Sequence, residues 1–186
     1  MERMEIESAP LSSVTTTGCF LMAAMPRIAT GPVGSSDVPF GPDLLFAASD
    51  IPGFVLHVEI CEDMFVPIPP SAEAALAGAT VLANLSASNI TVAKWEYRRV
   101  LVSSSSARNL ALQLYSASGF GESTSDLAWD GQGLIAERGI LIGETERFAL
   151  RGSSVIVDAD LQTLVQDRLR QNSFGANSRS FSDRTF

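Results

Sequence analysis

Three residue types that enzymes often use for chemistry are nearly absent from this sequence. Its 186 residues include one histidine, His57, one lysine, Lys94, and two cysteines, Cys19 and Cys61. Two cysteines are too few for a disulfide framework, which favours a reducing compartment, and we expect a cytoplasmic protein. Any mechanism that requires a lysine or a histidine therefore has one candidate for each role.

This scarcity excludes several kinds of site. One histidine and two cysteines 42 positions apart do not have the spacing of metal ligands, so no metal site is expected. His57 lies four residues before Cys61, about 13 Å along a strand, which is too far for it to act as that cysteine's base. We interpret His57 as a strand histidine held by a neighbour. The sequence also lacks the glycine-rich loop with a lysine that binds phosphates.

Positive charge and long hydrophobic runs are scarce as well. There are 13 lysines and arginines against 21 aspartates and glutamates, which gives a net charge of −8. This balance excludes nucleic acid and an anionic membrane surface as main partners. No apolar run approaches the ~18 residues of a membrane span. The apolar residues 19–25 follow Glu2, Glu5 and Glu7, which have the wrong charge for a secretory signal.

Predicted strands and helices alternate along the chain, which indicates a single α/β domain. Residues 1–9 are polar and acidic, residues 12–18 are rich in serine and threonine, and residues 31–36 are loop formers, so we expect an unrelated or disordered leader at residues 1–36. Ser71 and Asp160 are the predicted N-caps of the first and last helix, and from Gln171 onward we expect a frayed tail. We predict strands at 54–61, 80–85, 110–115, 134–136, 140–142 and 155–157, and helices at 72–77, 94–108 and 160–170.

Cys61 ends the clearest predicted strand, in which apolar side chains alternate with His57 and Glu59. A residue that leaves a strand at a sharp turn projects into the cleft at the strand ends, where a cysteine can act as a nucleophile. A free cysteine is also commonly buried for packing. From these residues alone, both interpretations of Cys61 stay open.

Two motifs and their surroundings carry a resemblance to a known family. Cys-Glu-Asp begins at Cys61 directly after the apolar strand, and Asn-Leu-Ser-x-Ser begins 23 positions later at Asn84. Together with residues 43–46 and 122–131, they resemble the nitrilase-type glutaminase domain of the glutamine-dependent NAD synthetases. The resemblance covers residues 37–175. Another nitrilase-type amidase is the less favoured alternative, because these motifs are more specific to the glutaminase domains than to nitrilases at large.

The resemblance implies an α-β-β-α sandwich and hydrolysis of the side-chain amide of glutamine. In such domains a cysteine forms a thioester, ammonia leaves, and water releases glutamate, with a glutamate as base and a lysine that stabilises the oxyanion. The ammonia passes to a synthetase domain that binds ATP and deamido-NAD. No cofactor is expected in this chain, because the Ser-Gly-Gly-x-Asp-Ser loop of the synthetase domain is missing from it.

Carried onto this sequence, the resemblance implies that Cys61 is the nucleophile. Glu62 and Phe65 match the turn that lines the glutamine site, where backbone amides near Phe65 can hold the carbonyl oxygen. Ser88 matches a ligand for the amino-acid end of glutamine. Lys94 lies where the family has a basic residue that faces the substrate carboxylate. The alternative for Lys94 is an exposed lysine at the start of a helix.

The sequence also departs from the family pattern. In the family, the base and the lysine precede the cysteine, whereas here the only lysine follows Cys61 by 33 positions, and no earlier glutamate lies in a matching motif. We therefore expect an incomplete sandwich, the C-terminal half of a glutaminase domain at residues 37–175, followed by a frayed tail at residues 176–186.

Half of such a domain would expose sheet edges and part of its apolar surface. We therefore expect homo-oligomerisation, or a partner that carries the N-terminal half of the glutaminase domain. Without the base and the catalytic lysine, the chain is expected to be inactive alone. The alternative is a non-catalytic fragment that packs against an intact homologue.

Overall fold

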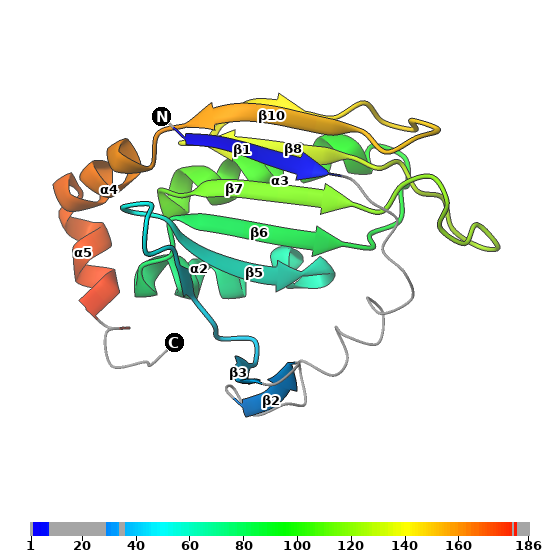
Figure 1. Cartoon of the computed structure of the whole chain (residues 1–186). Helices are drawn as coiled ribbons and strands as arrows, with labels where there is room; N and C mark the ends of the chain where they lie inside the picture. Colours follow the sequence, from blue (N-terminus) through cyan, green and yellow to red (C-terminus); the bar gives the residue numbers. More distant parts are fainter. Residues whose placement is uncertain (1, 8–28, 34–35, 180, 182–186) are drawn as a thin grey trace.

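A mixed sheet of six strands forms the centre of the molecule. The computed structural model describes residues 2–7, 29–33, 36–179 and 181. The strand order is β4-β5-β6-β7-β8-β9, in which β5, β6 and β7 run parallel and the other neighbours are antiparallel (Figure 1). The strands are β4 (Phe46–Ala47), β5 (Val55–Ile60), β6 (Val81–Ser86), β7 (Leu112–Ala117), β8 (Gly133–Glu137) and β9 (Ile140–Glu144).

Helices α2 and α3 cover one face of this sheet (Figure 1). Val102 of α3 clusters with Tyr115 and Leu134, and Ala74 of α2 clusters with Leu82, all of them buried. Among the described residues, no helix is long and apolar enough to cross a bilayer. The helices are the 3₁₀-helix η1 (Cys61–Phe65) and the α-helices α2 (Pro70–Ala77), α3 (Lys94–Asn109), α4 (Leu161–Arg170) and α5 (Asn172–Arg179).

The opposite face of the sheet is covered only in part. Leu161 and Leu164 of α4 are buried against Val81 and Leu112, and half-buried side chains of β10 (Ser154–Ala159) pack on the same cluster. β10 pairs antiparallel with β1 (Glu2–Glu7), and this ribbon lies in front of β7 and β8 (Figure 1). Over β6 the cover is incomplete, because Leu85 remains 40% exposed.

The central elements agree with the sequence predictions. The strands β5, β6, β7, β8, β9 and β10 and the helices α2, α3 and α4 all lie within a few residues of their predicted places, which confirms the α/β class. Asp160 caps α4 as predicted, because its carboxylate accepts a hydrogen bond from the Thr163 amide at 2.9 Å. The predicted cap Ser71 is wrong: α2 begins at Pro70, whose fixed φ suits the first helical position, so Ser71 lies inside the helix.

The two ends of the chain contain regular elements where the structure describes them. Residues 2–7 form β1 instead of an irregular leader, and their alternation of charged and apolar residues is the period-two pattern of a strand. Ala29–Val33 and Ser36–Phe40 form the antiparallel pair β2–β3. The rest of the expected leader, residues 1, 8–28 and 34–35, lies outside the described residues.

The expected frayed tail contains a helix, α5. The ring centroid of Phe174 in α5 lies 5.0 Å from the guanidinium carbon of Arg168 in α4. The Ser178 hydroxyl of α5 donates a hydrogen bond of 2.6 Å to the carbonyl of Leu76 in α2. These contacts supply the stabilisation that a short polar segment lacks on its own. Residues 180 and 182–186 of the expected tail lie outside the described residues.

Candidate functional site

Cys61 stands at the sharp turn where the buried strand β5 ends. It is the first residue of η1 and has a φ of +54°, in the left-handed region that non-glycine residues seldom adopt. The carboxylate of Asp63 accepts a hydrogen bond of 2.9 Å from the amide of Ile60 and so closes the turn. Backbone strain of this kind is concentrated at functional sites, and here it aims a partly exposed thiol away from the sheet.

A buried polar network lies beneath this turn. The side-chain amide of Asn84 in β6 donates to the carbonyl of Cys61 at 3.3 Å and to the carboxyl group of Glu59 at 3.4 Å. Glu59 also accepts a hydrogen bond of 3.1 Å from the Ser71 amide in the first turn of α2. Burial raises the pKa of Glu59, while these hydrogen bonds oppose the rise. The network joins the backbone of Cys61 to two neighbouring elements.

His57 is held by a neighbour, as the sequence analysis predicted. It is buried, and its Nδ1 donates a hydrogen bond of 3.1 Å to the carbonyl of Leu44. Burial lowers the pKa of His57, so the imidazole is neutral at pH 7. His57 and Glu59 share the helix-covered face of β5, which is the more buried face, although Leu56, Val58 and Ile60 are on the other side.

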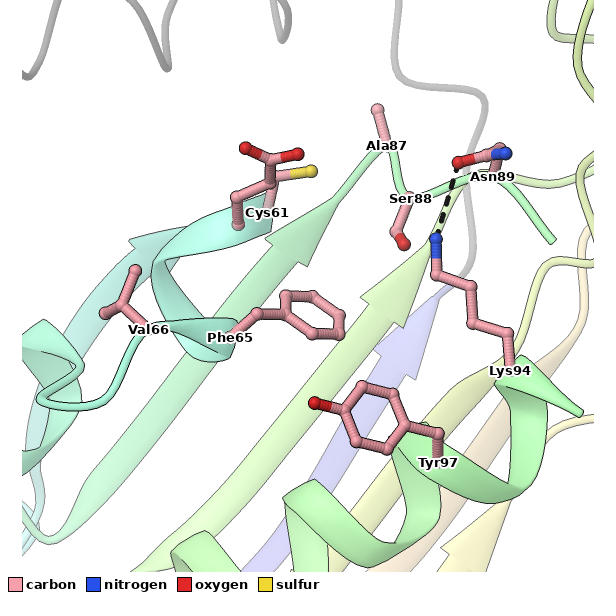
Figure 2. A pocket seen from close by; sticks show the side chains of 9 residues that line it. Cys61, Phe65, Val66, Ala87, Ser88, Asn89, Lys94 and Tyr97 are labelled. Atoms are coloured by element: carbon pink, nitrogen blue, oxygen red, sulfur yellow. Dashed lines mark hydrogen bonds between the residues drawn. The ribbon is translucent and has the colours of Figure 1, made fainter. Parts of the chain in front are cut away.

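A pocket of about 350 Å³ opens beside Cys61 (Figure 2). Three segments that are far apart in the sequence form it: the β5–η1 turn, the loop after β6, and the first turn of α3. All five residues that the sequence analysis singled out line this one pocket. The lining residues are Cys61, Glu62, Phe65, Val66, Ala87, Ser88, Asn89, Lys94 and Tyr97.

Lys94 brings positive charge to this pocket. Its ammonium group donates a hydrogen bond of 3.3 Å to the side-chain oxygen of Asn89 (Figure 2). Partial burial and the nearby charge of Arg98 lower the pKa of Lys94, while the acidic groups of Cys61 and Glu62 oppose that change. Lys94 is also the first residue of α3, where the helix dipole adds partial positive charge. The pocket therefore suits an anionic group beside the thiol.

Several lining residues were not found from the sequence. Tyr97 forms one wall with Phe65, and their ring centroids are 6.0 Å apart. Asn89 was interpreted only as part of a polar loop. Below the loop, the buried Arg98 pairs with Asp130 at 2.8 Å, although the two are 32 positions apart. No local pattern marks such a pair: Asp130 lies in the segment 122–131 that carries the family resemblance, but its pairing with an arginine of α3 depends on the fold.

No arrangement typical of a metal centre occurs in the part of the chain that the structure describes. There, no three histidine, cysteine, aspartate or glutamate side chains gather closely enough to hold a metal ion. The chemistry that the pocket offers is that of a thiol beside a turn, with one ammonium group, one carboxylate and a hydroxyl around it.

Comparisons with known proteins point to one family. No family model matches the chain. The glutamine-dependent NAD(+) synthetase of Mycobacterium tuberculosis is 60% identical over 153 residues, which are 82% of this chain and 22% of that protein. The crystal structure of a glutamine-dependent NAD(+) synthetase from Cytophaga hutchinsonii has a TM-score of 0.58 and 28% identity, and the match covers 74% of this chain and 21% of that one.

A more distant structure extends the likeness to a superfamily fold. Nit3 of Saccharomyces cerevisiae, a member of branch 10 of the nitrilase superfamily, has a TM-score of 0.50 and 19% identity, covering 62% of this chain and 41% of that one. The expected nitrilase-like fold is confirmed, and only part of it is present. The chain spans about a fifth of the length of the curated relatives it matches, 22% for the mycobacterial proteins.

Proposed function

Because the chain belongs to the glutamine-dependent NAD(+) synthetase family, we propose that it supplies the nucleophile and the substrate loop of a glutamine-hydrolysing site. The observation that carries this proposal is the pocket beside Cys61. The turn that bears the thiol, the loop with Ser88 and the helix start with Lys94 meet there and line one pocket.

In the proposed reaction, the thiolate of Cys61 attacks the side-chain amide carbon of glutamine. The C–N bond of the resulting tetrahedral intermediate breaks, and ammonia leaves with the proton that the Cys61 thiol gave to the base. The thioester that remains is attacked by water, which releases glutamate and restores the thiol. Backbone amides near Phe65, in the turn that follows the nucleophile, are suited to donate hydrogen bonds to the oxyanion.

The rest of the pocket matches the amino-acid end of glutamine. Lys94 faces the α-carboxylate, and the exposed carboxylate of Glu62 faces the α-ammonium group. The hydroxyl of Ser88 adds a hydrogen-bonding group, and the rings of Phe65 and Tyr97 form an apolar wall for the methylene groups. A volume of about 350 Å³ is within the range of small-molecule sites.

We propose that this site is completed from outside the 186 residues. The family resemblance places a base and an oxyanion-stabilising lysine before the cysteine, whereas Lys94 follows it and lies at the amino-acid end of the pocket. The proposed partners are the remaining part of a glutaminase domain and the synthetase domain that uses the ammonia, which would bind ATP and deamido-NAD. Assembly with such a partner, or with further copies of the chain, would cover residues such as the 40%-exposed Leu85.

Replacing Lys94 with alanine is expected to weaken glutamine binding by about 10- to 150-fold, because a hydrogen bond to a charged group contributes about 1.5–3 kcal/mol. Calorimetric titration with glutamine measures the loss. A Cys61→Ala background prevents turnover, and the remaining part of the domain is added if the chain alone does not saturate. Folding should be unaffected, since Lys94 is at the first position of α3 and only partly buried.

Arg99→Ala is the matched control for this substitution. It also removes a cation from α3, but Arg99 pairs with Glu144 and does not line the pocket. A second comparison uses 4-aminobutanamide, which is glutamine without its carboxylate. The wild-type protein should prefer glutamine, and the Lys94→Ala variant should not. Equal glutamine affinity in the wild type and Lys94→Ala would instead show that Lys94 is a solvated residue at a helix start.

A further inference from the structure

Arg98 is a fully buried cation directly beneath the pocket. Its side chain is 0% exposed, and one of its terminal nitrogens donates to the carboxylate of Asp130 at 2.8 Å. Asp130 is also buried and accepts a second charged hydrogen bond, of 2.9 Å, from Arg147. Asp130 thus holds two arginines, one inside the fold and one at its edge.

The other terminal nitrogen of Arg98 binds the loop that follows β6. It donates to the carbonyl of Ser88 at 2.6 Å and to the carbonyl of Asn89 at 3.2 Å. The same loop is fixed to the segment before Asp130, because the amide of Ile90 donates to the carbonyl of Ala128 at 2.8 Å. The loop therefore depends for its position on a guanidinium that does not itself reach the pocket.

This loop in turn places Lys94. The side-chain oxygen of Asn89 accepts the hydrogen bond of 3.3 Å from the Lys94 ammonium group (Figure 2). A continuous series of contacts thus runs from Asp130 through Arg98 and the loop to Asn89 and Lys94. The planar fork of the guanidinium serves four acceptors in different directions, the three named above and the side-chain oxygen of Gln132 at 3.4 Å, and the point charge of a lysine cannot replace it.

We propose that Arg98 and Asp130 are positioning residues of the pocket: their buried ion pair fixes the loop at residues 88–89, and the loop holds the ammonium group of Lys94 beside Cys61. The inference deepens the proposed function, because the anion that Lys94 would attract there is the glutamine carboxylate. The placement of Lys94 can nevertheless be tested without glutamine.

The test compares the alkylation of Cys61 by iodoacetate and by iodoacetamide. Both reagents attack the same thiolate, so the pKa of the thiol and its general accessibility cancel in the ratio of the two rates. Only the anionic reagent is attracted by the ammonium group of Lys94. Mass spectrometry of the Cys61 peptide gives both rates, and melting curves show that each variant is folded at the temperature used.

Arg98→Lys keeps the charge but loses the fork, and we expect the iodoacetate-to-iodoacetamide ratio to fall by about 3- to 10-fold. Lys94→Ala should lower the ratio equally. Arg99→Lys is the matched control, because Arg99 is the next residue of α3 and pairs with Glu144 at the surface, 3.4 Å away. The ratio for Arg99→Lys should equal that of the wild type.

Asn89→Ala keeps the test decisive if Arg98→Lys does not fold, because it breaks the connection to Lys94 and leaves the buried ion pair intact. Its ratio should also fall. An unchanged ratio in a folded Arg98→Lys variant or in Asn89→Ala would overturn the proposal. So would an equal fall in Arg99→Lys, or a wild-type ratio no higher than that of Lys94→Ala. Failure of glutamine to bind while the expected ratios hold would overturn only the proposed function.

Discussion

The 186-residue chain on its own is expected to hydrolyse glutamine at least about 10⁴-fold more slowly than a full-length mycobacterial relative measured beside it. Loss of one oxyanion-stabilising group typically reduces the rate by about 10²–10³. Loss of the general base reduces it by a further ~10²–10⁴, although groups that act as a unit do not combine simply. The single lysine of the chain, Lys94, follows the cysteine, and we propose that it binds the other end of the substrate.

Ammonia release in a coupled assay measures this rate, and a Cys61→Ala variant sets the background. The wild-type chain should be indistinguishable from that variant. Turnover within about 100-fold of the relative would contradict the account, because the chain would then have to supply by itself both the base and a replacement for the oxyanion-stabilising lysine. It would also exclude the alternative of a non-catalytic packing partner.

Arg168→Met is expected to lower the free energy of unfolding by about 3–5 kcal/mol, because it leaves three carbonyl groups without their donor and a buried acceptor that loses its partner costs about 1–3 kcal/mol. The guanidinium of Arg168 joins α4 to the C-terminal ends of two other helices. It donates to the carbonyls of Ala79 at 2.6 Å, Leu110 at 2.9 Å and Asn109 at 3.0 Å. Burial lowers the pKa of Arg168 to about 10, so the group remains a cation at pH 7.

Methionine preserves much of the apolar stem of Arg168 but leaves these carbonyls without their donor, near helix ends where positive charge is favourable. Arg170→Met is the matched control, because Arg170 lies in the same turn of α4 and its side chain is 74% exposed. Urea denaturation monitored by circular dichroism gives both values. A decrease in the free energy of unfolding below about 1 kcal/mol for Arg168→Met, or equal decreases for the two variants, would show that the hydrogen bonds of Arg168 do not stabilise the fold.

Much of the fold could be predicted from local patterns. Period-two alternation predicts β5, and Gly139 marks the hairpin turn between β8 and β9. Asp160 predicts the start of α4, because a short side chain that accepts hydrogen bonds caps the helix that follows it. The errors lie where distant contacts decide the structure. Residues 171–179 look too polar for a stable element, and the contact of Phe174 with Arg168 joins two helices in a way that the local sequence does not reveal.

The residues of the site also divide into those that the sequence indicates and those that only the folded structure brings together. Cys61 is recognisable as the end of a hydrophobic strand. Ser88 and Lys94 are distant from it in the sequence, and they come close to it because β5 and β6 run parallel and α3 follows β6. The family resemblance grouped these residues before the structure did. Arg98 was not found in this way, since an arginine in a helix is normally solvated, and the resemblance at residues 122–131 did not single out Asp130.

The central claim, that Cys61 is the nucleophile of a glutamine site, is tested most directly by a glutamine-like chloroketone. The reagent forms a bond from the cysteine sulfur to the methylene carbon and releases chloride, and peptide mapping by mass spectrometry locates the adduct. The account predicts modification of Cys61, protection by excess glutamine and no modification of Cys19, in the chain alone or supplemented with the remaining part of the domain. Modification of Cys19 in place of Cys61, or labelling of Cys61 that glutamine does not slow, would contradict it.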